Sequence, residues 1–290
     1  MMAALRPSVV LAGLLLAGES MAQDPPGTDI FLLKLAEAEG GHGVALTNIT
    51  DRQGYDNQPY FSKDGWLYYT RIENGQADIF RYDPSQGSIS PVTRSPESEY
   101  SPKPLPGEMA LSVIRVGADN RQLLETVPLD GLAQPRSLFP DIEPVGYHAW
   151  ITPETAALFV LGEPMTLQVA TLGGKPRVAA ENIGRALVSV PGRELAAFVL
   201  KSDSTDWAIK SVNADGDVQT VITTLPRRED FAIGPDGRYW MGDGSKLYHH
   251  RPGSGQWTLL QDFAELGLTD ISRLAVSPNG KTLALVSPDP

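Results

Sequence analysis

Short runs of alternating hydrophobic and polar residues, separated by turn residues, recur along this chain. Between residues 55 and 93, strand-like runs occupy 58–62, 66–71, 78–82 and 88–93. The intervening turns at 63–65, 73–75 and 83–87 carry the pairs Asp-Gly, Asn-Gly and Asp-Pro. Short aromatic and β-branched runs bounded by such pairs are typical of antiparallel hairpins. Four strands in roughly forty residues is the size of one blade of a β-propeller.

The same unit repeats along the rest of the chain. The first turn of the unit has counterparts at 105–108, 153–155, 191–193, 235–237 and 277–280, and each of these is followed by an apolar run. The spacing, about forty to forty-five residues, is that expected for blades with loops of variable length. The pattern predicts blades at about 56–97, 99–140, 146–181, 184–224, 228–262 and 271–287.

The two ends of the chain complement each other. The last unit stops after two strands, and residues 28–50 contain two spare ones. Residues 29–35 resemble the third strand of the first unit, and residues 44–50 resemble its fourth. Pairing the two ends would satisfy both free strand edges. We therefore expect an all-β fold, a single six-bladed β-propeller whose ring is closed by N-terminal strands (28–50) that complete the C-terminal blade (271–287).

The best preserved unit also resembles a known family. The segment NQPYFSKDG at 57–65 and the strand DIFRYD at 78–83 are similar to the WD40-like (PD40) repeats of TolB-type propellers. This resemblance implies a six-bladed propeller used for protein contacts. Because the α/β domain that precedes the TolB propeller is not found here, it implies a stand-alone secreted member, occupying residues 23–290.

The N-terminus has the pattern of a cleavable export signal. Arg6 precedes the apolar stretch at 9–17, and Ser20-Met21-Ala22 is a small-x-small cleavage pattern. Such a stretch is shorter than a membrane span. We expect a signal peptide over residues 1–22, cleavage near Ala22, and a periplasmic or secreted protein with no transmembrane segment after cleavage.

Charge and cysteine content narrow the function. The formal net charge is −11 over 290 residues, and cysteine is absent. An acidic chain without a basic stripe argues against nucleic-acid binding. The lack of cysteine excludes disulfides, thiolate nucleophiles and cysteine-bound metals. We expect a monomer whose partner is a protein or a peptide.

The motifs of common hydrolases are missing. The chain has neither Gly-x-Ser-x-Gly nor His-Glu-x-x-His, and the adjacent His249 and His250 would point to opposite faces of a strand. Six-bladed lactonases hold a cation in their tunnel with several carboxylate and amide oxygens. The predicted tunnel has only two carboxylates, both from one blade and beside two arginines. We assign no catalytic residue, metal ligand or cofactor.

The tunnel itself is the candidate site. Aligning the blades back from their first turns places two rings of side chains where each innermost strand begins, at what we call the top face. These rings mix Tyr, His, Arg and acidic residues, types common in recognition sites. The expected binding residues are Asn57, Gln58, Tyr100, Tyr147, His148, Arg185, Glu229, Asp230 and Arg273.

Two interpretations of these charges remain. Arg185 and Arg273 can bind a carboxylate with their paired donors, or the two arginines and the two acids can simply neutralise one another across the tunnel. The favoured function is a non-enzymatic binding or scaffold module that recognises a protein or peptide on its top face. The alternatives are a small-molecule hydrolase or lyase of the lactonase type with a tunnel cation, and a binder of sugars or peptidoglycan fragments.

Overall fold

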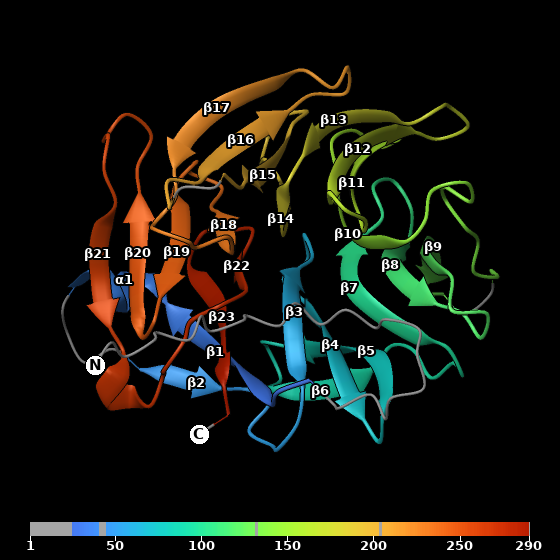
Figure 1. Ribbon diagram of the computed structural model, residues 1–290. Coiled ribbons are helices and arrows are strands. Elements are labelled where there is room, and N and C mark those ends of the chain that lie inside the picture. The colour runs from blue at the N-terminus through green and yellow to red at the C-terminus, as the bar shows by residue number, and fades with distance from the viewer. Residues whose placement is uncertain (1–24, 41–44, 131–132, 203–204, 290) are drawn as a thin grey trace, which may run out of the picture.

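The protein is a ring of six antiparallel sheets around a central axis (Figure 1). This computed structural model describes residues 25–40, 45–130, 133–202 and 205–289. In each sheet the strand that begins the blade lies nearest the axis, and the following strands step outward. The predicted six-bladed β-propeller is therefore confirmed.

The first three blades follow one another along the chain. The first contains β3 (Asp56–Phe61), β4 (Leu67–Glu73), β5 (Gln76–Asp83) and β6 (Ser88–Pro91). The second contains β7 (Ser98–Pro104), β8 (Ala110–Val116) and β9 (Gln122–Pro128). The third contains β10 (Val145–Trp150), β11 (Thr155–Val160), β12 (Thr166–Thr171) and β13 (Arg177–Glu181).

The remaining blades include the one that closes the ring. The fourth contains β14 (Ile183–Ser189), β15 (Ala196–Leu200), β16 (Ala208–Val212) and β17 (Val218–Thr223). The fifth contains β18 (Phe231–Ile233), β19 (Tyr239–Asp243), β20 (Lys246–His250) and β21 (Thr258–Asp262). The sixth has the order β22 (Leu274–Val276), β23 (Thr282–Pro288), β1 (Thr28–Lys34) and β2 (Leu46–Asn48).

The N-terminal strand closes the ring as the sequence predicts. β1 pairs antiparallel with β23 in an unbroken register that runs from Thr28 opposite Pro288 to Lys34 opposite Thr282. The side chain of Ile30 is fully buried and packs in one cluster with Val286 and with Tyr69 of the first blade. Each terminal segment thus supplies the strand edge that the other lacks. Two short helices, α1 (Leu35–Gly40) and η1 (Ala264–Leu266), lie beside this seam.

The second blade departs from the expected four strands. Its sheet has three, and the outer edge of β9 is covered by an irregular segment. The Thr126 amide donates to the Arg136 carbonyl and the Leu138 amide to the Leu124 carbonyl, both at 2.9 Å. The Arg136 amide donates to the Thr126 hydroxyl at 3.1 Å and not to a carbonyl of β9, so the ladder is not continued there.

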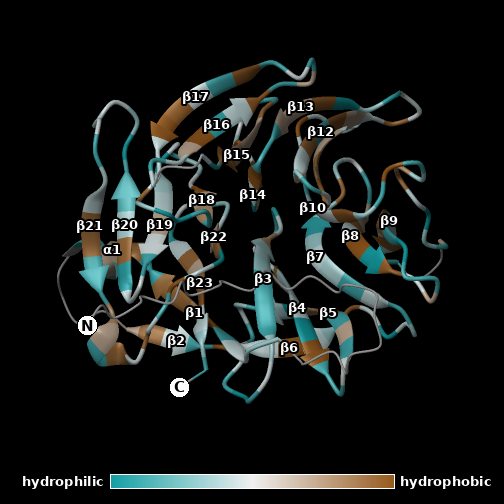
Figure 2. Ribbon diagram, in the orientation of Figure 1, coloured by the Kyte–Doolittle hydropathy of each residue, from teal (hydrophilic) through white to brown (hydrophobic). Residues whose placement is uncertain are grey.

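The core lies between neighbouring blades, and the strands that face the axis are more polar than those behind them. Figure 2 shows hydrophobic residues concentrated on strands such as β8 and β16, whereas β3 and β7 are largely hydrophilic. Trp150 and Trp240 are buried in clusters that join adjacent blades. Stability thus comes from contacts between blades, which leaves the polar inner strands free to line a site.

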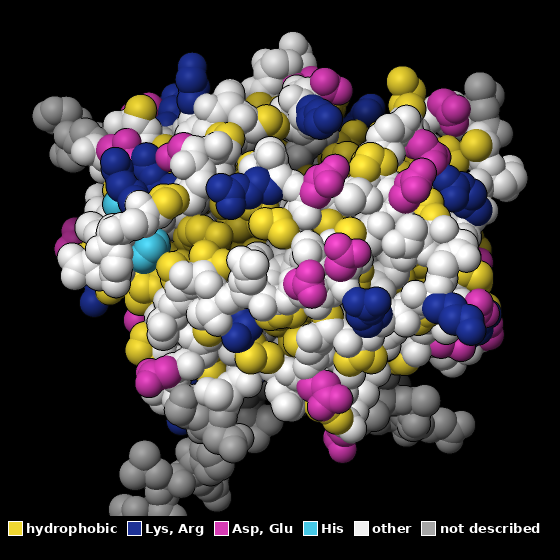
Figure 3. All heavy atoms as spheres, turned by 90° about the horizontal axis from the view of Figure 1, so that it is seen from above, with side chains coloured by type: hydrophobic (Ala, Val, Ile, Leu, Met, Phe, Trp, Pro, Cys, Tyr) yellow, Lys and Arg dark blue, Asp and Glu magenta, His cyan; other side chains and the backbone are white. Residues whose placement is uncertain are grey.

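The outer rim is mixed in character. Figure 3 shows charges of both signs interspersed with hydrophobic side chains on the side of the ring that carries β13 and β17 in Figure 1. Among the described residues, no helix is long and apolar enough to cross a membrane. The predicted signal peptide, residues 1–22, lies outside the described residues.

Candidate functional site

The innermost strands are irregular where the predicted rings lie. The pairing with the second strand slips between Asn57 and Tyr60 in β3, and between Tyr100 and Lys103 in β7. Gln58 and Ser101, at equivalent places in these strands, have positive φ angles of 59° and 53°. Such bulges redirect side chains. Alternation along these strands therefore does not by itself determine which side chains face the axis.

A large cavity occupies the axis below these bulges. Its volume is about 880 Å³, and it is bounded by the second halves of the inner strands and by the turns that follow them. The cavity therefore opens at the bottom face, where the inner strands end, and its closed end lies at the predicted rings. Six of the expected residues line it: Gln58, Tyr147, His148, Arg185, Asp230 and Arg273.

The closed end is built from an ion-pair network that spans the axis. Arg185 Nη2 lies 2.5 Å from Asp230 Oδ2, and its Nε donates to Asp230 Oδ1 at 3.2 Å. Arg273 Nε lies 3.3 Å from the same Oδ1. Arg273 also donates from Nη2 to the Tyr147 hydroxyl at 2.8 Å and stacks over that ring, 4.6 Å from its centroid. Arg273 belongs to the sixth blade and Tyr147 to the third, so this contact closes the tunnel.

The two arginines dominate the electrostatics of this end. Burial alone would raise the pKa of Asp230, but the charges of Arg273 and Arg185 outweigh it and hold that pKa below its usual value. Burial would lower the pKa of Arg185, but Asp230 more than compensates and raises it. Asp230 is therefore ionised and shared by two arginines. Arg185 also pairs with Glu229 at 3.7 Å, and Glu229 pairs with Lys201, so the whole network has three cations and two carboxylates and keeps one positive charge in excess.

Three expected residues have other roles. Asn57 is buried and donates to the Thr28 hydroxyl at 3.1 Å, which ties the first blade to the closing strand. Glu229 lies 2.8 Å from Lys201 Nζ and accepts the Arg185 amide at 2.9 Å. Tyr100 packs against the cluster between the second and third blades. These three residues are not among the described residues that line the cavity.

Two of the lining residues are already engaged in its wall. Gln58 Oε1 accepts the Ser101 amide at 2.7 Å and the Thr70 hydroxyl at 2.9 Å, so this side chain joins two blades. His148 is fully buried, and its Nε2 lies 2.7 Å from the Ser112 hydroxyl. Burial lowers the pKa of His148 well below 6.5, so the ring is neutral. Both residues shape the cavity.

The alignment missed one cation. Lys103 lies on β7, lines the same cavity and donates from Nζ to the Leu187 carbonyl at 2.8 Å. The pairing of β7 slips between Tyr100 and Lys103, so simple alternation along the strand gave no signal that Lys103 faces the cavity. Lys103 thus adds an amine to the deep part of the cavity, beside Arg185, Arg273 and Asp230.

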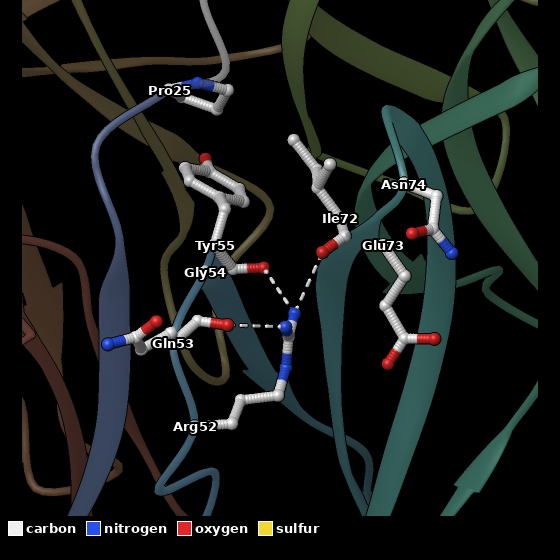
Figure 4. Close-up of a pocket in the computed structure, with 8 residues that line it drawn as sticks. All are labelled: Pro25, Arg52, Gln53, Gly54, Tyr55, Ile72, Glu73 and Asn74. Carbon is white, nitrogen blue, oxygen red and sulfur yellow. Dashed lines mark hydrogen bonds between the residues drawn. The ribbon is translucent and has the colours of Figure 1, made fainter.

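A smaller hollow lies at the top face. Its volume is about 430 Å³, and it is lined by Pro25, by residues 52–55 and by residues 72–74 (Figure 4). The Arg52 guanidinium points into it but donates to the Gln53 and Ile72 carbonyls, both at 2.8 Å (Figure 4). Its Nε lies 2.8 Å from Asp56, a buried acid. These contacts anchor the loop before β3 and hold the Arg52 guanidinium in place.

No cluster of three His, Cys, Asp or Glu side chains suited to a metal ion occurs within the described ranges. Among the described residues that line the closed end of the cavity, Asp230 alone has a carboxylate, and two arginines hold it. A calcium-type site needs several converging oxygens, and this arrangement does not offer them.

Comparison with known proteins supports the fold. No protein-family model and no curated protein sequence matches the chain. Among solved structures, a putative TolB from Agrobacterium tumefaciens superposes with a TM-score of 0.70 at 14% identity, covering 92% of this chain and 99% of that one. A gluconolactonase from Xanthomonas campestris gives a TM-score of 0.65 at 11% identity, covering 91% and 99%. An oligogalacturonate lyase in complex with manganese gives a TM-score of 0.58 at 14% identity, covering 84% of this chain and 80% of that one.

These neighbours are a putative TolB and two enzymes. At such identities a structural likeness establishes the fold and not the chemistry, because propellers host many functions. The chain is a six-bladed β-propeller, similar in fold to TolB and to propeller lactonases and lyases.

Proposed function

We propose that this protein is an exported binding module that captures an apolar, carboxylate-bearing segment of a protein or peptide partner. The proposed binding site is the axial cavity, which is entered from the bottom face. The sequence pointed to the top face, but the large hollow lies at the other end of the same residues. The single observation that carries this proposal is the excess of positive charge at the closed end of that cavity.

The charge of the cavity floor is opposite to that of the molecule. Arg185, Arg273 and the Lys103 amine line the floor with Asp230, and Glu229 behind them pairs with Arg185 and Lys201, so one positive charge is in excess even when Lys103 is uncharged, whereas the whole chain has a formal charge of −11. Arg273 and Lys103 each have donors besides those used in the bonds given above. A buried excess of cations lowers the free energy of an incoming carboxylate, which would form charge-assisted hydrogen bonds there. The floor thus favours an anionic group at the tip of a ligand.

The walls of the cavity favour an apolar segment behind that group. The residues that bound the cavity include Phe61, Leu105, Trp150, Leu187 and Phe231, and the lining surface is mainly apolar. At the mouth lie the prolines of the first turns, and Met109, whose exposed fraction is 74%. Proline fixes the backbone of these turns, so the mouth loses little entropy on binding. A peptide with hydrophobic residues and a free carboxylate fits both parts.

Peptide libraries test this proposal directly. The mature chain would be incubated with two N-acetylated hexapeptide libraries, one with a free C-terminal carboxylate and one amidated. Retained peptides would be identified by mass spectrometry, and their affinities measured by fluorescence anisotropy. We expect selective retention of the free-acid library. Loss of one charge-assisted bond to a buried carboxylate corresponds to about 1.5–3 kcal/mol, so Arg273→Gln should weaken binding by roughly tenfold or more.

The matched control is Arg94→Gln, which removes the same charge from an exposed position on the loop between β6 and β7. It should leave the affinity nearly unchanged because exposed charges are screened. Lys103→Gln leaves the arginine network intact and provides a second test if Arg273→Gln does not fold. Equal retention of the two libraries, or none, would overturn the proposal. Turnover of lactones or oligogalacturonates by the unmodified protein would instead support the enzymatic alternative.

A further inference from the structure

The Lys103 amine lies in the same cavity as Arg185 and Arg273 and forms no ion pair with a described carboxylate. Its side chain enters the cavity from the second blade, and its Nζ reaches the Leu187 carbonyl in the fourth. The ammonium also lies 5.4 Å from the centre of the Tyr60 ring. No described carboxylate lies within ion-pair distance of Lys103. Lysine normally keeps its charged end in water, so this placement calls for a chemical reason.

The surroundings of Lys103 favour the uncharged amine. Burial, followed by the charge of Arg273, lowers the pKa of Lys103 to about 7. Asp230, the nearest acid at the closed end, is already shared by two arginines and does not compensate. The charged and titratable groups that surround the deep cavity are Tyr60, Tyr147, His148, Arg185, Asp230 and Arg273.

A lysine in this setting has a known chemical use. An amine that is desolvated or placed next to another cation keeps its lone pair at neutral pH and attacks carbonyl carbons. The cavity also has the space and the access that such a reaction needs, since Lys103 lines a hollow of about 880 Å³ with an open mouth. Arg273, in the same hollow, can bind a carboxylate on the same small molecule.

We propose that Lys103 is a nucleophilic amine that forms an imine with a small aldehyde or ketone carrying a carboxylate. The lone pair of Nζ attacks the carbonyl carbon and forms a C–N bond. The nitrogen loses its two protons, and these leave with the carbonyl oxygen as one molecule of water. The product is a C=N bond between the ligand and Lys103. The imine would form in the same cavity as the proposed peptide site, but its formation does not require that a peptide binds there.

Reductive trapping tests the inference. The mature chain would be incubated at pH 7.5 with glyoxylate, an aldehyde that carries a carboxylate, and with cyanoborohydride, which reduces an imine to a stable secondary amine. Peptide mapping would then give the labelling rate of every lysine. We expect Lys103 to be labelled at least roughly tenfold faster than any other lysine. With acetaldehyde, which lacks the carboxylate, this preference for Lys103 should fall several-fold.

The matched variants separate this reaction from peptide binding. Lys103→Arg keeps the positive charge but cannot form the imine, so it should lose the fast labelling while still retaining free-acid peptides. Lys175→Arg, at an exposed turn, should leave the fast labelling intact. Labelling spread evenly over the lysines of the unmodified protein would overturn the inference without any variant. An equal preference for Lys103 with both aldehydes would refute the role given to the carboxylate.

Discussion

Asp230 determines the character of the axial site because its single carboxylate is shared by two arginines from different blades. Arg185 donates two hydrogen bonds to it, one to each oxygen, and Arg273 Nε lies near Oδ1. Arg185 also pairs with Glu229, which in turn pairs with Lys201, so these charges largely neutralise one another as one interpretation of the sequence expects. Three cations against two carboxylates still leave one positive charge in excess. That excess is the basis of the proposed carboxylate binding, which stays a proposal.

Lys103 gives a pH dependence that stability measurements can detect. Its pKa in the folded protein is lowered from 10.5 to about 7, so between these values the unfolded chain binds more protons. The free energy of unfolding should therefore rise with pH, by up to about 1 kcal/mol per unit between pH 7.5 and 9. Urea unfolding at several pH values would measure this slope.

The variant Lys103→Met should flatten that slope, whereas Lys175→Met, at an exposed turn, should keep it. The buried tyrosines do not interfere, since burial raises the pKa values of Tyr60 and Tyr69 above 10 and they titrate only at higher pH. An unchanged slope in Lys103→Met would show that the lysine keeps its ordinary pKa.

At the scale of elements, β1 contributes more than its position at the chain start suggests. It lies third in the sixth sheet, with β23 on one side and β2 on the other. Outer strands such as β13 are different, since one of their edges is free and residues such as Val178 are 53% exposed. Equal truncations on the two strands should therefore have unequal effects.

Ile30→Ala should lower the free energy of unfolding by about 3 kcal/mol, because it removes a fully buried side chain between two blades. Val178→Ala on β13 should cost less than about 0.5 kcal/mol, as expected for an exposed position. Chemical denaturation of both variants would give these values. Similar losses would mean that β1 does not hold the closing seam.

At the scale of the whole molecule, the ring has one closing joint. Every other blade is made from consecutive strands, and only the sixth combines both ends of the chain. A propeller with an open joint exposes two strand edges and the apolar faces of its neighbouring blades. The closure is therefore a property of the entire ring and not of one sheet.

Removing residues 23–50 should leave the sixth blade half-built and lower the melting temperature of the entire protein. Circular dichroism and calorimetry on the mature and shortened chains would compare them, with removal of residues 23–25 alone as the control. A shortened chain that melted like the mature one would contradict the six-blade closure.

Much of the fold follows from the sequence alone. Turn pairs such as Asp64-Gly65 and Asn74-Gly75 and the alternating runs between them are local signals, and Gly65 and Gly75 do adopt positive φ angles of 87° and 77°. Because a blade is a local unit repeated along the chain, local signals suffice to count the blades. The second blade is the exception, since its missing outer strand depends on how residues 133–138 lie against β9.

The site was decided by the tertiary structure. Residue types at the tunnel were predicted, but the bulges at Gln58 and Ser101 set which side chains face the axis, and alternation cannot reveal a register slip. Six of the nine expected residues line the cavity, whereas Asn57, Tyr100 and Glu229 pack within or between blades. Contacts between blades far apart in the chain determine which face is hollow and which charged side chains meet there. The sequence determines the repeat because hairpins are local; the ring determines the site because its walls come from all six blades.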